Sequence, residues 1–183
     1  TGMLAKILSD AKQKPTAMVG SIVRDFPPAG GSNFLAGDDK LFVVEACEYR
    51  DHVLKLDPAI LVITNIELDH TDYFPNLEAL KETFRTAVEK VPAHGVIVTN
   101  STDPVIADVI KHAKARVFDY TQMAVGQLQL LGEFNRDNAR AALAAAHLAF
   151  PQLSLEAGVK SLSEFKGSWR RFEYKGDTPN GAL

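Results

Sequence analysis

Two short apolar runs without polar alternation constrain the fold of this chain more than any other feature. They are AILVITN (59–65) and GVIVTN (95–100). A strand with one solvated face alternates apolar and polar residues, so an unbroken run indicates a strand covered on both faces, as in a parallel sheet. LFVVEA (41–46) and RVFDY (116–120) are further strand candidates. We expect 59–65 and 95–100 to be central strands, with 41–46 adjacent to 59–65.

Helical patterns alternate with these strands along the chain. The chain opens inside a helical pattern, TGMLAKILSDA, and further helices are expected at 76–91, 103–113, 135–150 and 154–165. Strand–helix alternation predicts an α/β fold with a doubly wound, mostly parallel sheet flanked by helices. The Pro- and Gly-rich stretch 25–39 predicts a long loop or a small extra β hairpin.

Composition excludes several classes of protein. The 183 residues carry 20 basic and 23 acidic side chains and no basic cluster, so we expect no nucleic acid partner. No run approaches the roughly 20 apolar residues of a membrane span, so we expect no membrane contact. Cys47 is the only cysteine, which rules out an internal disulfide and suits a cytoplasmic protein.

Polar residues follow the buried strands abruptly. Glu45 ends one strand, Asn65 ends the next, and His70 follows among the acids of IELDHTDYF (66–74). Ligands of open parallel sheets bind beyond the carboxyl ends of the strands, and clustered carboxylates there indicate a divalent cation. The alternative is that Glu45 and Asp69 bond loop or helix amides while His70 is a surface histidine.

Three ordered motifs resemble the central domain of the Mur ligase family. They are EACEYRDHVLKLDPAILVITNIELDHTDYF (45–74), GEFNRDNARAALAAA (132–146) and GSWRRFEYKG (167–176). The resemblance implies a P-loop-NTPase-like ATP-binding domain over 1–176, with 177–183 beginning a linker to a C-terminal domain. The family's phosphate-binding loop, G-T-x-G-K-T/S, is expected directly before a helix like TGMLAKIL and is absent from this sequence. We therefore expect the chain alone to be inactive.

The resemblance also implies roles for individual residues. Glu45 matches the carboxylate that holds Mg²⁺ on the ATP phosphates, and His70 matches the ligand of a second Mg²⁺, for which Mn²⁺ would substitute. Arg171 matches an arginine that reaches the ATP phosphates, and its alternative is a surface pair with Glu173. The remaining expected cofactor-binding residues are Asn135, Asn138, Arg170 and Asn65.

The asparagines and the acids near the expected metal ligands have more specific expected roles. Asn135 and Asn138 are expected on the adenine side of ATP, although Asn135 is equally suited to cap a helix start. Glu48, Asp69 and Asp72 are expected to orient the metal ligands.

Enzymes of this family transfer the γ-phosphoryl group of ATP to a substrate carboxylate, and an amino acid's amine then displaces phosphate. Within the family the motifs favour the branch that adds L-alanine to UDP-N-acetylmuramate, with other domains supplying the contacts to those substrates. A murein-tripeptide recycling ligase or another family member is the alternative. A non-catalytic nucleotide-binding module is the alternative from another functional class.

Overall fold

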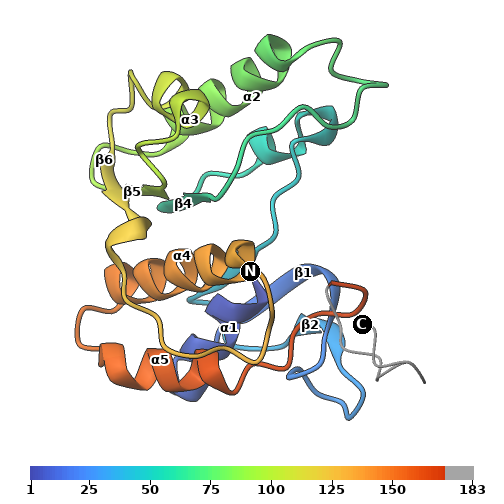
Figure 1. The fold of residues 1–183 in the computed structure, drawn as a ribbon, viewed down its shortest axis with the longest axis vertical. Coiled ribbons are helices and arrows are strands. Elements are labelled where there is room, and N and C mark those ends of the chain that lie inside the picture. The colour runs from blue at the N-terminus through green and yellow to red at the C-terminus, as the bar shows by residue number, and fades with distance from the viewer. Residues whose placement is uncertain (172–183) are drawn as a thin grey trace.

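A computed structural model describes residues 1–171 of the chain, and it contains two separate three-stranded sheets (Figure 1). One sheet has the strand order β4-β5-β6, and all its strands are parallel. Helices α2 and α3 pack on one face of this sheet, and α4 packs on the other. The bounds are β4 (Ile60–Ile63), α2 (Leu77–Lys90), β5 (Val96–Thr99), α3 (Pro104–Val109), β6 (Arg116–Asp119) and α4 (Glu133–Ala149).

The second sheet is mixed and has helices on one face only. Its order is β2-β1-β3, in which β1 pairs antiparallel with β2 and parallel with β3. Helices α1, α4 and α5 cover its inner face. The bounds are α1 (Gly2–Asp10), β1 (Thr16–Val23), β2 (Ser32–Leu35), β3 (Phe42–Val44) and α5 (Leu155–Ser163).

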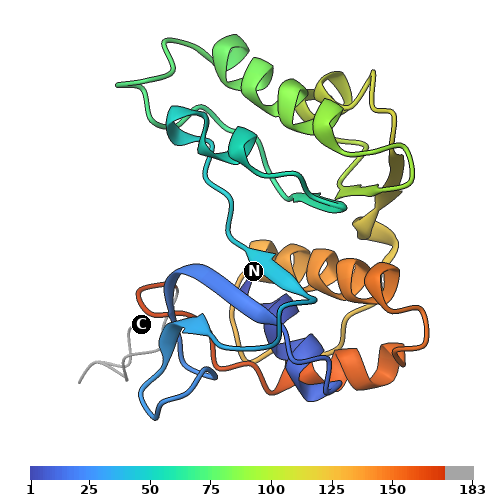
Figure 2. The ribbon, with the colours of Figure 1, turned by 180° about the vertical axis from the view of Figure 1, so that it is seen from behind.

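Helix α4 joins the two halves of the molecule. It lies between the β4–β6 sheet and the layer formed by α1 and α5, as seen from both sides in Figures 1 and 2. Ala139 and Ala142 pack into the core with α1, whereas Ala141 and Ala144 pack against Val98 beneath the parallel sheet. Alanine suits this position because it favours a helix and its short side chain lets neighbouring elements approach closely.

The short 3-10 segments η1 (Tyr49–Lys55) and η2 (Tyr120–Gln122) complete the fold. Segment η1 carries the chain from the mixed sheet to the parallel sheet. Segment η2 follows β6 and holds the buried Tyr120, whose hydroxyl donates to the carbonyl of Thr64 at 3.2 Å. Burial raises the pKa of Tyr120 to about 12, and the nearby carboxylates of Asp137 and Asp119 add to the effect.

The expected fold class is confirmed, and strands and helices form where the patterns predicted them. The expectation that the strands at 41–46 and 59–65 are neighbours is wrong, because β3 and β4 belong to different sheets. The expectation that β4 is central is also wrong, since it pairs only with β5 among the described residues. An apolar run reports that both faces of a strand are covered and says nothing about its hydrogen-bonded edges.

Three further outcomes concern the chain's less regular parts. Strand β2 lies within the stretch 25–39 and pairs antiparallel with β1, so the expected small hairpin is formed by β1 and β2. No helix in residues 1–171 is long and apolar enough to cross a bilayer. Residues 172–183, including Glu173 and the predicted linker, lie outside the described residues.

Candidate nucleotide and metal site

Glu45 lies where β3 leaves the mixed sheet. Its amide donates to the carbonyl of Met18 on β1 at 2.9 Å, which extends the strand pairing by one residue. A Cβ added to Gly20 on β1 would lie only 2.8 Å from Oε1 of Glu45. Gly20 therefore leaves room for the exposed Glu45 carboxylate to lie over β1.

The start of α1 packs against β1, since a Cβ added to Gly2 would lie 3.0 Å from Cγ2 of Val23. The start of α4 lies beside this end of the chain in both views (Figures 1 and 2). The starts of α1 and α4 therefore lie near each other, and helix starts favour anions such as phosphate.

A second segment brings two arginines to this part of β1. The amide of Arg24 donates to Gly167 O at 3.2 Å, and the amide of Trp169 donates to Ile22 O at 2.8 Å. The hydroxyl of Ser21 donates to Trp169 O at 2.8 Å. Residues 167–169 therefore run along the end of β1 and deliver the following arginines beside Gly20.

The arginines line a shallow cleft of about 320 Å³. Its lining residues are Gly20, Ser21, Ile22, Asn33, Trp169, Arg170 and Arg171. The Arg170 guanidinium lies over the Trp169 ring at 4.8 Å, a cation–π contact that holds it in place. Arg171 is exposed, and its amide closes a turn by donating to Ser168 O at 3.1 Å. Because Gly20 touches the Glu45 carboxylate and also lines this cleft, the cleft and the carboxylate are contiguous.

The two asparagines of α4 have different environments. Asn135 is buried, and its Nδ2 donates to Leu131 O at 2.7 Å. The alternative that Asn135 caps the helix is wrong, because the cap residue is Gly132, whose φ of 94° suits glycine. Asn138 is exposed one turn further along. Asn135 therefore shapes the helix start, and Asn138 presents its amide to solvent.

His70 and Asn65 lie on the loop that follows β4. Nε2 of His70 is 3.5 Å from Oε1 of Glu48, and Asn65 is exposed directly after the strand. Glu45 and His70 thus come from different elements, and residues 1–171 contain no group of three metal-ligating side chains already gathered. A carboxylate and an imidazole are both able to bind Mg²⁺ or Mn²⁺, so the donor types fit a metal although the cluster is not preformed.

Two other polar features are structural or lie elsewhere. Asp119, at the carboxyl end of β6, accepts bonds from Ser101 and Thr121. Burial alone would raise the pKa of Asp119, but these bonds outweigh it and lower the pKa.

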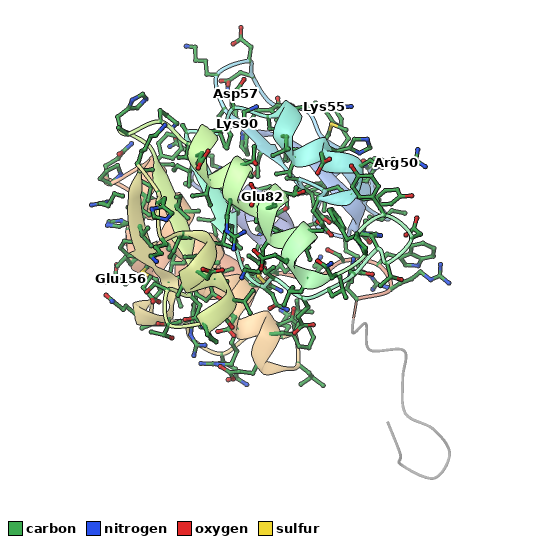
Figure 3. All side chains as sticks on the ribbon, turned by 90° about the horizontal axis from the view of Figure 1, so that it is seen from above. Arg50, Lys55, Asp57, Glu82, Lys90 and Glu156 are labelled. Carbon is green, nitrogen blue, oxygen red and sulfur yellow. The ribbon has the colours of Figure 1, made fainter. Side chains whose placement is uncertain are left out.

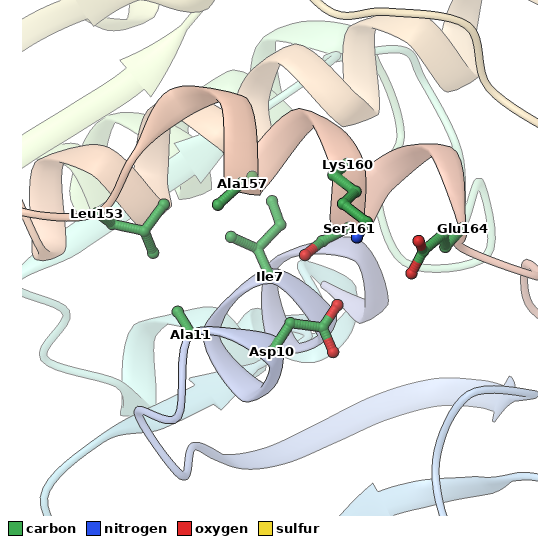
Figure 4. Close-up of a pocket in the computed structure, with 9 residues that line it drawn as sticks. Ile7, Asp10, Ala11, Leu153, Ala157, Lys160, Ser161 and Glu164 are labelled. Atoms are coloured by element: carbon green, nitrogen blue, oxygen red, sulfur yellow. The ribbon is translucent and has the colours of Figure 1, made fainter.

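A cleft of about 270 Å³ between α1 and α5 contains Asp10 and Glu164 (Figure 4). It lies at the far end of α1 from Thr1, so it is separate from the Glu45 region.

The sequence patterns did not identify Gly20, Asn33 or Trp169 as part of this region. The run TAMVGSIV does alternate, with Ala17, Val19 and Val23 buried and Met18 exposed, so β1 was detectable from its period. Its pairing with residues 167–169, almost 150 positions away, could not be predicted, because no pattern among neighbouring residues indicates it.

Comparisons with known proteins identify the family. The pattern described as the Mur ligase middle domain matches residues 1–126, more than half of the chain. UDP-N-acetylmuramate--L-alanine ligase from Caldicellulosiruptor bescii is 33% identical over 97% of this chain and 44% of its own length. The enzyme of the same name from Aquifex aeolicus is also 33% identical, over 100% of this chain and 45% of its own length. The chain thus spans a little under half the length of these relatives.

Solved structures share the fold. UDP-N-acetylmuramate:L-alanyl-gamma-D-glutamyl-meso-diaminopimelate ligase from Neisseria meningitides superposes with a TM-score of 0.80 at 24% identity, covering 92% of this chain and 63% of that one. UDP-N-acetylmuramate-alanine ligase from Thermotoga maritima gives 0.74 at 21% identity, covering 98% and 45%. At these identities the likeness concerns the fold alone. The family pattern, the relatives and the fold agree, and the chain belongs to the Mur ligase family, of whose ligases it contains the middle domain.

Proposed function

We propose that this chain is the ATP-binding middle domain of a cytoplasmic ligase that joins L-alanine to UDP-N-acetylmuramate. The observation that carries the proposal is that the Glu45 carboxylate and the Arg171 cleft lie together at Gly20 on β1. Both relatives quoted above, at 33% identity, are named for this reaction. The substrates would also contact parts of the ligase beyond these 183 residues.

The proposed reaction has two steps. An oxygen of the sugar's carboxylate attacks the γ-phosphorus of ATP, and ADP leaves. The amine of L-alanine then attacks the carboxyl carbon of the acyl phosphate and loses a proton, and phosphate departs with the carboxylate oxygen. Every reacting group is electron-rich, so positioning and charge neutralisation are the main tasks of the protein.

The residues of this chain have separate tasks in that scheme. Glu45 and His70 are the residues that would hold Mg²⁺, and Mg²⁺ would supply charge neutralisation at the phosphates. Arg171 presents a planar guanidinium with paired donors to the phosphates from the cleft beside Gly20. Asn138 and Asn65 are the proposed contacts to the nucleotide, and both side chains are exposed and so available to a ligand.

A murein-peptide ligase is the second candidate. Two proteins whose solved structures share this fold are named as ligases of such peptides, with TM-scores of 0.80 and 0.73. Their sequence identities of 24% and 20% support the fold and do not assign the substrate. Supplying the full-length ligase with either L-alanine or a tripeptide, and measuring phosphate release, separates the two candidates.

The role of Glu45 is tested by Glu45→Gln in the full-length ligase. We expect at least a 10²-fold lower rate of phosphate release, the size of loss that follows removal of one strong electrostatic stabiliser. The melting temperature should stay unchanged, because Glu45 is exposed. The matched control is Glu164→Gln, which makes the same change in the separate α1–α5 cleft and should leave the rate unaltered. A normal rate for Glu45→Gln would remove Glu45 from the site, and nucleotide binding without any ligation would favour a non-catalytic module.

A further inference from the structure

The loop that carries His70 is held in a conformation that needs support. His70 has a φ of +52°, in the left-handed region that residues other than glycine rarely adopt. Its carbonyl accepts bonds from the amides of Tyr73 at 2.8 Å and Phe74 at 2.9 Å, and its amide donates to Asp69 Oδ1 at 2.7 Å. Such a conformation costs of order 1–3 kcal/mol and persists where surrounding contacts enforce it.

Segment η1 supplies contacts around the imidazole. The Tyr49 ring lies 4.8 Å from the His70 ring, centroid to centroid, and its hydroxyl donates to Asp72 Oδ2 at 2.8 Å. Oε1 of Glu48 lies 3.5 Å from Nε2 of His70. Glu48 and Tyr49, which lie against the His70 imidazole, therefore follow Glu45 by only three and four residues.

Asp51 fastens the same segment to the helix behind it. One of its carboxylate oxygens accepts from the Thr83 hydroxyl of α2 at 2.6 Å, and the other accepts from the Tyr73 hydroxyl at 2.5 Å. Thr83 is buried, so this anchor lies on the rigid part of α2. The bonds from Thr83 and Tyr73 lower the pKa of Asp51, which keeps the carboxylate ionised and able to accept both.

The two ends of η1 are both tied to α2. Arg50 and Asp51 have φ of 51° and 56°, so the start of η1 shares the left-handed strain of His70. At its other end, Nζ of Lys90 donates to Leu54 O at 2.5 Å and pairs with Asp57 at 3.0 Å. Lys90 and Asp57 lie together in the view from above, and Arg50 projects outward from η1 (Figure 3). A strained segment fixed at both ends is a rigid support.

We propose that Tyr49 and Asp51 are positioning residues that hold the His70 imidazole in its place relative to Glu45. The sheet does not set this geometry, because β3 and β4 are not paired. The clamp formed by Tyr49, Asp51, Tyr73 and Thr83 sets it, since η1 continues from Glu45 and grips the His70 loop. The value of that geometry for metal binding rests on the proposed function.

The test uses Tyr49→Phe, Asp51→Asn and the milder Tyr73→Phe in the full-length ligase, with two readouts. The NMR signal of the His70 imidazole reports its position through the ring current of residue 49, which Tyr49→Phe keeps while it breaks the bond to Asp72. The electron paramagnetic resonance signal of free Mn²⁺ reports binding of that ion alone. We expect Tyr49→Phe and Asp51→Asn to shift the His70 signal and to weaken Mn²⁺ binding about 10-fold or more, as for loss of a group that orients a ligand.

Two designs separate positioning from general damage. Tyr120→Phe also removes one tyrosine hydroxyl bond, to Thr64 O, and should leave both readouts unaltered even where the melting temperature falls. Tyr73→Phe and Asp51→Asn break the same bond, so the double variant should change Mn²⁺ binding less than the sum of the two single variants. Tyr73→Phe keeps the ring of a half-exposed side chain and serves as the test if Asp51→Asn fails to fold.

The outcomes distinguish this inference from the proposed function. An unshifted His70 signal in folded Tyr49→Phe and Tyr73→Phe would overturn the clamp. A shifted signal with unaltered Mn²⁺ binding would support the clamp and remove the metal role of His70 from the proposed function.

Discussion

Arg170 and Arg171 show how neighbouring residues of one type differ in what they are able to bind. Arg170 has a φ of 60° and its guanidinium is already engaged by the Trp169 ring. Arg171 is exposed and lines the cleft beside Gly20, next to the Glu45 carboxylate. At the residue scale, Arg171 is therefore better placed than Arg170 to meet a phosphate, although the motif contains both.

The substitution Arg171→Lys tests this difference. It keeps the positive charge but replaces a planar fork of donors with a single ammonium, so the paired contact to phosphate is lost. We expect the ATP concentration for half-maximal rate to rise roughly tenfold, equivalent to about 1.4 kcal/mol of binding free energy. The melting temperature should stay within error, because exposed ion pairs contribute only about 0–1 kcal/mol.

Arg170→Lys is the matched control, and it should change the ATP requirement less. Equal ATP dependence in the wild type and in Arg171→Lys would assign Arg171 to the surface. The cleft beside Gly20 would then lose its connection with the nucleotide.

At the scale of elements, two asparagines near the start of α4 differ in their environment, since Asn135 is buried and Asn138 is exposed. The buried Asn135 ties the helix to the Leu131 carbonyl, and the exposed Asn138 makes no hydrogen bond of that kind within the described residues. The two lie three positions apart, so both fall on the same side of the helix near its first turns. The motif alone predicts the same role for both asparagines, whereas their different burial indicates a structural role for Asn135 and leaves Asn138 available to a ligand.

The pair Asn135→Ala and Asn138→Ala tests that division. Asn135→Ala removes a partner from a backbone carbonyl and should lower the free energy of unfolding by about 1–2 kcal/mol. Asn138→Ala should leave the free energy of unfolding within about 0.5 kcal/mol and weaken ADP binding, measured by calorimetry on the full-length ligase. The reverse pattern, with stability lost in Asn138→Ala alone, would show that the two roles are exchanged.

The sequence predicts elements from signals that lie within a few residues. Continuous apolar runs located β4 and β5, and helical periodicity located α2, α4 and α5. Whether β4 pairs with β3 depends on edges, which carry no side-chain signal. The clamp around His70 was equally hidden, because it depends on left-handed φ at Arg50, Asp51 and His70 and on bonds across more than 20 positions.

At the scale of the whole molecule, residues of α4 pack into the cores beneath both sheets, and the start of α4 lies beside the start of α1 (Figures 1 and 2). The predicted site residues come from both halves: Glu45 and Arg171 from the mixed sheet and its neighbouring segment, and His70 and Asn65 from the loop after β4. Their joint action therefore requires the two halves to keep a fixed relation. Helix α4, which packs into both cores, and η1, which connects β3 with β4, set the position of one half relative to the other.

The proposed function requires the full-length ligase to form an acyl phosphate on the carboxylate of UDP-N-acetylmuramate before L-alanine attacks. The most direct measurement supplies UDP-N-acetylmuramate labelled with ¹⁸O in its carboxylate, together with ATP and L-alanine, and analyses the released phosphate by mass spectrometry. We predict that each phosphate carries one oxygen from the carboxylate, and that Glu45→Gln slows release of this labelled phosphate. Release of unlabelled phosphate, or ADP formation without amide product, would contradict the account.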